Sequence, residues 1–479
     1  MFYSTETRAV LENPILATDS YKLSHWLQYP VGTDGMFSYI ESRGGKYDRV
    51  LMFGLQMILM DFLAWPITRE DVALAKEIAT AHGEPFNEAG FLRIVDAHNG
   101  YWPVRIRALP EGSIVPSLIP LVTIESTDPQ LPWVVSFIET LVLQVWYPIT
   151  VATQSWHVRE IIKGYLEETS TDPAGQLPFK LHDFGYRGVS SPQSAARGGL
   201  AHLVSFKGTD TLAAVLAGRA YYAEPMAGYS IPAAEHSTIT SWGRDGELEA
   251  YRNMLRQYGK PNALFACVSD SYDIYNTVEH LWGGVLRQEV IDSGAVLVVR
   301  PDSGNPADVV LKCVALLDEK FGSVLNAKGY KVLERVRVIQ GDGINERTIR
   351  EILATLKING YSADNIAFGM GGALLQQVNR DTLKFAMKCS AIRVNGEWRE
   401  VYKDPVTDPG KASKRGRMTV WRNRETGDYM TAVLPGRSGW EDRVIEPGAV
   451  WEDVMETVWE NGALKRKVTL ADVRARALG

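Results

Sequence analysis

The sequence predicts an α/β protein, an irregular α/β barrel with a flanking α+β domain built from both chain ends. Two observations in the middle of the chain predict the barrel. Short apolar runs rich in β-branched residues alternate with longer amphipathic segments, and a polar or glycine-rich cluster follows each apolar run. Buried parallel strands with returning helices show this rhythm. A doubly wound sheet shows the same alternation, but repeated clusters that converge at one end of the strands favour the barrel.

The predicted strands and helices of the barrel follow from these runs. The apolar runs are residues 263–268, 295–299, 336–340 and 365–368. The clusters that follow them are residues 269–273, 300–305, 341–343 and 369–372. Between the runs, residues 306–321 and 346–358 carry apolar side chains at helical spacing, which predicts two crossover helices. Because parallel α/β proteins bind ligands at the carboxyl ends of their strands, the clusters are candidate site segments.

Both chain ends differ from the middle. Residues 106–124 predict short strands and turns, and Asn395-Gly396 and Thr426-Gly427 are hairpin signals. We therefore expect residues 1–150 and 385–479 to form the two parts of the flanking domain, and residues 151–384 to form the catalytic barrel.

Composition limits the class of function. The chain has 479 residues, 45% hydrophobic and 23% charged, with a formal net charge of −6, which argues against a broad nucleic-acid-binding surface. Its three cysteines, Cys267, Cys313 and Cys389, lack metal-ligand spacing and favour a reducing compartment. The start of the chain does not resemble a secretory signal, and the uncharged stretch 140–156 predicts a buried helix instead of a membrane span. We expect a cytoplasmic enzyme without nucleic-acid or membrane partners.

Residues 180–191 (KLHDFGYRGVSS) are typical of a binding site. They combine aromatic rings, a guanidinium group and glycines, and they lack the apolar periodicity of a buried strand or helix. The alternative is an ordered loop in which Arg187 forms a structural ion pair.

Several motifs together resemble the nicotinamide phosphoribosyltransferases. They are residues 17–22 (ATDSYK), 180–191, 206–211 (FKGTDT), 232–238 (PAAEHST), 269–273 (SDSYD), 300–306 (RPDSGNP) and 340–343 (QGDG). The resemblance extends from about Asn13 to about Arg474, and the short link between Arg43 and Val50 suggests a compact microbial or phage-like member. It implies transfer of phosphoribosyl from phosphoribosyl pyrophosphate to nicotinamide in NAD salvage, by a homodimer with shared active sites that uses Mg²⁺ and takes ATP as a co-substrate.

The resemblance also implies how the nicotinamide ring is held. Phe184 and Tyr21 lie on opposite faces of the pyridine in this family, across a dimer interface. Asp210 accepts from the carboxamide NH2 and Arg300 donates to its carbonyl oxygen, so that Asp210 repels the carboxylate of nicotinate. For Tyr21 and Phe184 core packing is the commoner role, and for Asp210 the alternative is a helix cap before the apolar run that follows.

Phosphate and ribose contacts are implied at glycine turns and basic residues. The ribose and 5'-phosphate positions are Gly341, Asp342, Gly371 and Gly372, in turns whose N–H groups suit anions. The pyrophosphate contacts are Arg187, Arg300 and His236. Further substrate-binding candidates are Asp19, Arg43, Arg380, Lys388, Lys403 and Lys411; the run 411–417 could equally be a solvated loop.

His236, Asp270 and Asp302 are the catalytic candidates. The matching histidine of the family is phosphorylated by ATP, and Asp270 and Asp302 are candidates for orienting the imidazole, the ribose hydroxyls and hydrated Mg²⁺. Direct metal ligands are not assigned. Three alternatives remain, namely a nicotinate phosphoribosyltransferase, a non-catalytic nucleotide-binding relative, and a sugar-phosphate lyase or isomerase; the last lacks a strand-end lysine for a Schiff base.

Overall fold

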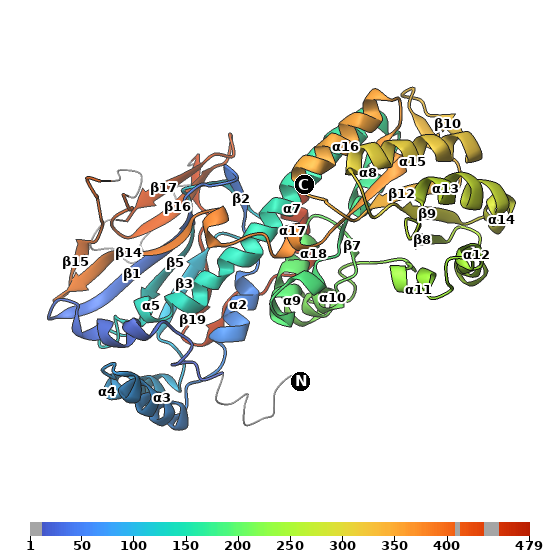
Figure 1. Cartoon of the computed structure of the whole chain (residues 1–479). Coiled ribbons are helices and arrows are strands. Elements are labelled where there is room, and N and C mark those ends of the chain that lie inside the picture. Colours follow the sequence, from blue (N-terminus) through green and yellow to red (C-terminus); the bar gives the residue numbers. More distant parts are fainter. Residues whose placement is uncertain (1–11, 408–411, 435–449) are drawn as a thin grey trace. The chain divides into compact units, whose positions relative to one another are not determined.

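The protein is described by a computed structural model over residues 12–407, 412–434 and 450–479. These residues form two compact units (Figure 1). We call residues 151–378 the barrel unit, and residues 1–150 with 379–479 the flanking unit. The α/β class predicted from the sequence is confirmed.

The barrel unit is built on a six-stranded parallel sheet with the order β7-β6-β13-β12-β9-β8. Its strands are β6 (Leu181–Asp183), β7 (Gly208–Thr209), β8 (Leu264–Val268), β9 (Val296–Arg300), β12 (Val336–Gln340) and β13 (Ile366–Met370). The four predicted strands are confirmed, with ends that differ by one or two residues at most.

An extended segment, residues 229–234, joins the two edge strands of this sheet. On the β7 side, the N–H of Thr209 donates to the carbonyl of Tyr229 at 2.9 Å, and on the β8 side the N–H of Ala266 donates to the carbonyl of Pro232 at 2.9 Å. The ring of backbone hydrogen bonds is thus completed by a segment that is not a regular strand. This is the irregular barrel that the sequence predicts.

Helices connect the strands of the barrel unit. Both predicted crossover helices are confirmed at their predicted ends, as α15 (Pro306–Phe321) and α16 (Glu346–Ile358). Each begins at an asparagine, Asn305 or Asn345, whose side chain accepts two N–H groups of the first turn. The other helices used below are α9 (Pro192–His202), α10 (Leu212–Tyr222), α11 (His236–Thr240), α12 (Glu247–Tyr258), α13 (Ile274–Asn276), the π-helix η5 (Thr277–Val285) and α14 (Arg287–Ser293).

The flanking unit contains one sheet made from both chain ends. Its order is β15-β14-β1-β5-β3-β19-β20. The strands are β1 (Thr33–Ser42), β3 (Val104–Ala108), β5 (Pro120–Ser126), β14 (Phe385–Val394), β15 (Glu397–Glu400), β19 (Glu456–Glu460) and β20 (Ala463–Leu464). The pairing of β1 with β14 and of β3 with β19 therefore confirms a flanking domain with contributions from both ends.

Both predicted hairpins are also present. Asn395 and Gly396 take φ of 51° and 81° between β14 and β15, the left-handed conformation that a tight hairpin needs. Thr426-Gly427 lies between β16 (Met418–Asn423) and β17 (Tyr429–Val433).

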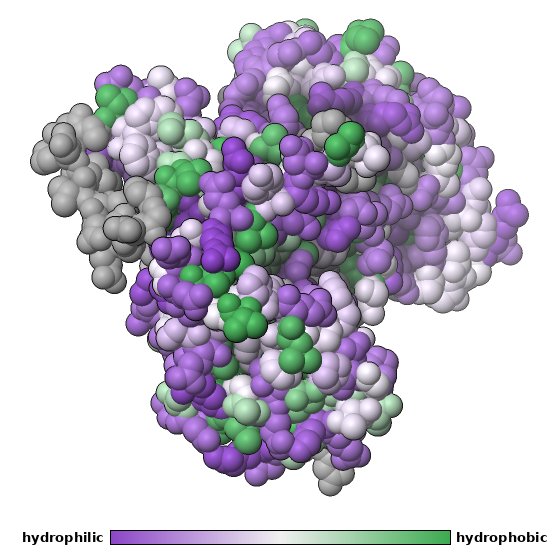
Figure 2. All heavy atoms as spheres, turned by 90° about the vertical axis from the view of Figure 1, so that its left-hand side faces the viewer, coloured by the Kyte–Doolittle hydropathy of each residue, from purple (hydrophilic) through white to green (hydrophobic). Residues whose placement is uncertain are grey.

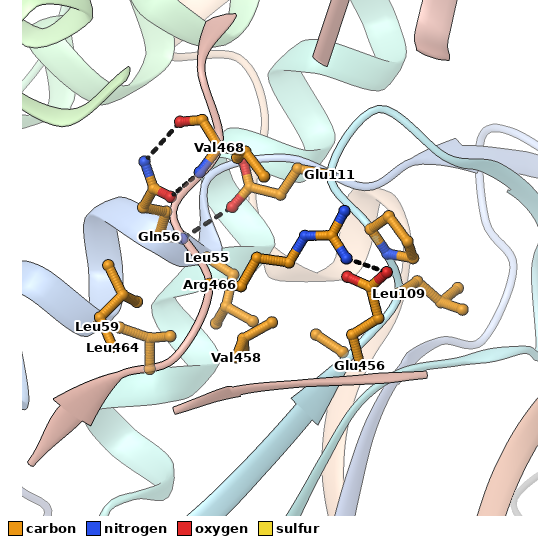
Figure 3. Close-up of a pocket in the computed structure, with 12 residues that line it drawn as sticks. Leu55, Gln56, Leu59, Leu109, Glu111, Glu456, Val458, Leu464, Arg466 and Val468 are labelled. Atoms are coloured by element: carbon orange, nitrogen blue, oxygen red, sulfur yellow. Dashed lines mark hydrogen bonds and ion pairs between the residues drawn. The ribbon is translucent and has the colours of Figure 1, made fainter. Parts of the chain in front are cut away.

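A polar clasp fastens the carboxy-terminal segment within the flanking unit (Figure 3). The amide of Gln56, on α2 (Leu55–Phe62), exchanges two hydrogen bonds with the backbone of Val468 at 3.1 and 2.8 Å. The carboxylate of Glu111 accepts the N–H groups of Gly54 and Gln56 at the start of α2. The cavity beside this clasp has a volume of about 30 Å³, which suits a water molecule but not a substrate. We therefore assign the clasp and its cavity a structural role.

The face seen in Figure 2 is mainly hydrophilic, with hydrophobic residues scattered across it. Among the described residues no helix is long and apolar enough to cross a membrane. The uncharged stretch 140–156 is helical, as predicted, and is divided between α6 (Glu139–Val142), η2 (Leu143–Val145) and the start of α7 (Trp146–Thr169).

Candidate active site

Most of the predicted site residues lie at one edge of the barrel unit. Each follows, or ends, a parallel strand, so that the carboxyl ends of the strands bring them together. They are Phe184 and Arg187 after β6, Asp210 after β7, Asp270 after β8, Arg300 and Asp302 at the end of β9, Gly341 and Asp342 after β12, and Gly371 and Gly372 after β13. His236 follows the segment that closes the barrel.

His236 and Asp270 form a hydrogen-bonded pair. The Nε2 atom of His236 lies 2.9 Å from Oδ1 of Asp270. The Asp270 side chain is 6% exposed, whereas that of His236 is 48% exposed. An ionised carboxylate can only accept a hydrogen bond, so Nε2–H donates and Nδ1 is left for a ligand. A carboxylate that holds one imidazole nitrogen in this way fixes the tautomer of the ring.

The Arg300 side chain contacts the turn that follows its own strand and the segment that closes the barrel. Its Nη2 lies 3.3 Å from Oδ2 of Asp302, and its Nη1 donates to the carbonyl of Ala234 at 3.4 Å. The other Asp302 oxygen approaches the backbone of Gly341, where an added Cβ would lie 2.9 Å from Oδ1. Glycine at 341 therefore allows the turn after β12 to lie against the Asp302 carboxylate.

A cavity of about 320 Å³ lies inside the barrel unit. Its apolar lining includes Ile231, Ala233, Ala266, Val298, Ile339 and Ala367. The aromatic and polar groups on it include Phe184, Asp210, Ser230 and Arg300. An apolar pocket with a few convergent polar groups is the usual form of a small-molecule site, and this volume lies at the lower end of the usual range.

The Phe184 ring packs directly on the backbone of β13. A Cβ added at Gly369 would lie 2.0 Å from Cε2 of the ring. The Phe184 N–H donates to the carbonyl of Met370 at 3.0 Å, and the N–H of Gly185 donates to Oδ1 of Asp183 at 2.7 Å. The backbone at Phe184 is thus fixed by its own N–H and by that of Gly185, and its ring lies at the cavity wall.

Asp210 is oriented by a serine from the closing segment. The hydroxyl of Ser230 donates to Oδ1 of Asp210 at 2.5 Å, and the Asp210 N–H donates to the carbonyl of Asp183 at 3.0 Å. The N-cap position of helix α10 is Thr211, one residue later, and the Asp210 side chain bonds to Ser230 instead, so Asp210 does not cap this helix. Ser230 was not predicted, because its partner lies on another strand end.

Three further titratable groups lie in or beside the cavity. Burial raises the pKa of the Asp183 carboxyl to about 6, lowers the pKa of the His182 imidazole, and lowers the pKa of the Lys180 ammonium to about 7. The Lys180 Nζ donates to the carbonyls of Asp364 and Ile366, both at 3.0 Å. All three belong to the predicted site segment 180–191, although the sequence pattern predicts no role for any of them.

Arg187 lies on the short turn η4 (Tyr186–Gly188) beside the second glycine turn. A Cβ at Gly188 would lie 3.5 Å from the Cα of Gly372, so the two turns are in contact. Arg187 is exposed, and it forms no ion pair with the residues that the structure describes. Its guanidinium is available to an anion near Gly371 and Gly372.

Tyr21 projects from an anchored helix in the flanking unit. Helix η1 (Ser20–Leu27) carries the Tyr21 side chain, which is 56% exposed and stacks edge-on with His25 at 4.7 Å. The neighbouring Lys22 is buried and its Nζ bonds to Oε2 of Glu139 at 2.7 Å. Asp19 accepts from the Thr140 hydroxyl at 2.8 Å. The chain on both sides of Tyr21 is therefore fixed, whereas its ring faces solvent.

Three of the predicted basic residues in the flanking unit act electrostatically on a fourth, Lys388. Burial lowers the pKa of the Lys388 ammonium, and the negative charge of Glu139 opposes this decrease. The positive charges of Lys403, Arg43 and Arg380 lower the pKa further. Such a group of like charges is suited to a polyanion. Lys411 lies outside the described residues.

No group of three or more histidine, cysteine, aspartate or glutamate side chains that could hold a metal occurs in the described part of the chain. A metal cage made only of protein ligands, as at structural zinc or calcium sites, is therefore absent there. The single carboxylates at the strand ends fit instead an ion that brings water and phosphate ligands with it.

Comparisons with known proteins identify the family of the chain. Residues 179–436 match the nicotinate phosphoribosyltransferase family, and residues 13–106 match the N-terminal domain of nicotinamide phosphoribosyltransferase. A nicotinamide phosphoribosyltransferase of Xanthomonas campestris pv. campestris is 60% identical over 98% of both chains. One of Acinetobacter baylyi is 32% identical over 97% of both chains.

Solved structures share the fold. Human nicotinic acid phosphoribosyltransferase superposes with a TM-score of 0.62 at 18% identity, covering 96% of this chain and 92% of the other. The nicotinate-nucleotide pyrophosphorylase of Pyrococcus furiosus gives 0.61 at 16% identity, covering 100% and 97%. The chain therefore belongs to the nicotinate phosphoribosyltransferase family and, within it, to the nicotinamide phosphoribosyltransferases.

Proposed function

We propose that this protein converts nicotinamide and phosphoribosyl pyrophosphate to nicotinamide mononucleotide and pyrophosphate, as a step of NAD salvage. The observation that carries the proposal is the barrel cavity, whose lining includes the Phe184 ring, the Asp210 carboxylate and the Arg300 guanidinium, each at the carboxyl end of a strand. A flat heteroaromatic amide has the matching shape and polarity.

Each of these groups has a partner on nicotinamide. The Phe184 ring offers an apolar face to the pyridine. The Asp210 carboxylate, with Oδ1 held by Ser230, keeps lone pairs for the carboxamide NH2, and Arg300 donates to the carboxamide oxygen. Nicotinate would bring a second carboxylate toward Asp210, and this repulsion favours the amide over the acid.

The transfer itself needs positioning more than proton transfer. The pyridine nitrogen attacks the anomeric carbon with its lone pair, a C–N bond forms, and the C–O bond to pyrophosphate breaks with its electron pair leaving on oxygen. No general base is required. The site must stabilise positive charge on the ribose and negative charge on the leaving group, tasks suited to Asp302 and to the side chains of Arg187 and Arg300.

We further propose that ATP phosphorylates His236. The Nδ1 lone pair attacks the γ-phosphorus, an N–P bond forms, and the P–O bond to ADP breaks. The hydrogen bond from Nε2–H to Asp270 stabilises the positive charge that develops on the ring. The phosphoenzyme then binds phosphoribosyl pyrophosphate more tightly.

Mg²⁺ fits the available donors as an ion that arrives with the substrate. Asp270 and Asp302 would face its water shell, and the ion would neutralise charge on the leaving pyrophosphate. We also infer a homodimer in which Tyr21 of one subunit serves the site of the other. Free Cys267, Cys313 and Cys389 fit the reducing conditions of the cytoplasm.

The test is a kinetic comparison of two arginine variants. Arg300→Gln should lower kcat/KM for nicotinamide by about 100-fold, since a charge-assisted contact is lost in a confined site. Arg347→Gln, on the exposed face of α16, should leave it unchanged. Absence of nicotinamide mononucleotide with the wild-type protein would overturn the proposal in favour of a non-catalytic relative.

A further inference from the structure

A π-helix lies directly behind the loop that carries Asp270. Helix η5 (Thr277–Val285) has nine residues and continues from α13, whose first turn is capped by Asp273. Long π-helices are rare, and π-turns in proteins are frequently found at functional sites. Trp282 on this helix lies fully in the interior and is 0% exposed.

The Trp282 indole binds the residue next to Asp270. Its Nε1–H donates to the hydroxyl of Ser269 at 3.1 Å. That hydroxyl donates in turn to the carbonyl of Cys267 at 2.9 Å, and the Ser269 N–H donates to the carbonyl of Arg300 at 3.0 Å. Ser269 is itself fully buried, so this chain of bonds fixes the backbone from which the Asp270 side chain departs.

The same indole contacts the element that follows His236. Trp282 lies on the ring of Tyr251, with centroids 4.8 Å apart and planes at 35°. Tyr251 belongs to α12, which packs against α11, the helix that starts at His236. The Tyr251 hydroxyl is held by Glu247 at 2.8 Å, which keeps the ring in place. One buried side chain thus supports both partners of the His236–Asp270 pair.

We propose that Trp282 is a positioning residue for the His236–Asp270 pair and, resting on the proposed function, for the transfer of phosphate from ATP to His236. The indole touches neither substrate nor His236. It acts through Ser269, which sets the direction of the Asp270 carboxylate, and through Tyr251, which supports α11. Loss of the Nε1 bond leaves Asp270 free to turn and His236 without a fixed tautomer.

The variant that isolates the Nε1 bond is Trp282→Phe, which keeps an aromatic ring and removes the donor. Ser269→Ala removes the acceptor of the same bond. The matched control is Trp102→Phe in the flanking unit, because Trp102 is equally buried and its Nε1 has no hydrogen-bond partner among the described residues. The control measures the effect of shrinking a buried tryptophan without the loss of a hydrogen bond.

Two readouts separate positioning from folding. The first is the gain in kcat/KM for phosphoribosyl pyrophosphate on adding ATP, together with the acid-labile phosphate on the protein. In W282F and in S269A the gain should fall about five-fold, while the rate without ATP changes less than about two-fold. The double variant should be no worse than either single variant. W102F should retain the wild-type gain.

The second readout is the ¹⁵N NMR spectrum of the His236 imidazole, assigned by its loss in His236→Ala. The wild-type protein should show the Nε2–H tautomer, and W282F a mixture of tautomers. Equal behaviour of W282F and W102F in both readouts would overturn the inference. If the wild-type protein shows no ATP gain and no phosphohistidine, the ATP step of the proposed function fails. The tautomer then decides the role of Trp282 by itself: a mixture in W282F supports it, and an unchanged spectrum overturns it.

Discussion

The ring of Phe184 lies so close to the backbone of Gly369 that a Cβ at position 369 would be 2.0 Å from Cε2 and 2.1 Å from Cδ2. Gly369 lies within β13 and its φ is not in the left-handed region, so the backbone itself would accept alanine. The glycine is needed because the aromatic ring occupies the space of its side chain.

Gly369→Ala should therefore act through Phe184. The ring must move away from β13, and its face no longer meets the nicotinamide ring. We expect KM for nicotinamide to rise at least about 10-fold, as expected for loss of an aromatic contact and its positioning, with a smaller change in KM for phosphoribosyl pyrophosphate. Initial rates at saturating co-substrate measure this. Gly164→Ala, where no atom lies within 4 Å of the new Cβ, is the matched control. Equal KM values in both variants would contradict the packing argument.

Asp210→Asn should weaken the preference for the amide over the acid. The charge that repels nicotinate disappears, while a carbonyl oxygen remains to accept from the carboxamide. We expect the ratio of kcat/KM for nicotinamide to that for nicotinate to fall about 10- to 100-fold, the effect of one charged contact in a confined site. Competition between the two bases measures this ratio.

Ser230→Ala is a milder change at the same site than Asp210→Asn, because it leaves the Asp210 carboxylate in place. It removes only the bond that holds Oδ1. A loss of a few-fold in kcat/KM for nicotinamide, with the preference kept, is expected for one neutral orienting bond. An unchanged ratio in Asp210→Asn would show that specificity lies elsewhere.

Much of the barrel unit is predictable from the sequence because its signals are local. The β-branched run 336–340 and the apolar spacing in 306–321 and 346–358 correspond to β12, α15 and α16 with the same ends. Each helix also begins at an asparagine that caps it, a signal contained in a few consecutive residues.

Other features depend on tertiary contacts, and the sequence does not predict them. The sequence places Gly369 in the glycine cluster 369–372, whereas its contact with Phe184 exists only once β6 pairs with β13. The η5 segment has the composition of an ordinary helix, and its π form was not predicted. Residues 229–234 close the barrel without a strand pattern, so Ser230 was missed as the partner of Asp210. Local propensity carries no information about such long-range pairings.

Lys180→Met should change how stability depends on pH. The folded-state pKa of Lys180 is lowered by burial to about 7, below its ordinary value of 10.5. At pH values between these two pKa values the unfolded chain binds the proton and the folded chain does not. The free energy of unfolding therefore rises with pH across this window, and the gain is lost as the pH falls through 7. One such group contributes a slope of at most about 1.4 kcal/mol per pH unit.

Urea unfolding at several pH values from 7.5 to 9.5 tests this prediction. The methionine variant should show a flatter dependence than the wild-type protein. Lys163→Met, which removes a half-exposed lysine, should keep the wild-type slope. The same slope in all three proteins would mean that Lys180 is charged in the folded state.

Lys22→Met should impair nicotinamide binding only through Tyr21. It breaks the bond to Glu139 that anchors η1, at a cost of about 1–3 kcal/mol for a partly buried pair. We expect KM for nicotinamide to rise about five-fold in the wild-type background and not further in a Tyr21→Ala background. Lys76→Met, which breaks an exposed pair in the same unit, is the control. Additive effects of Lys22→Met and Tyr21→Ala would contradict the anchoring role.

The most direct test of the whole account is product formation under competition. The purified protein is given phosphoribosyl pyrophosphate, Mg²⁺ and equal concentrations of nicotinamide and nicotinate, with and without ATP, and the products are separated by mass. The account predicts nicotinamide mononucleotide as the product, in larger amount with ATP. Formation of nicotinate mononucleotide as the main product would contradict the role of Asp210 and with it the central claim.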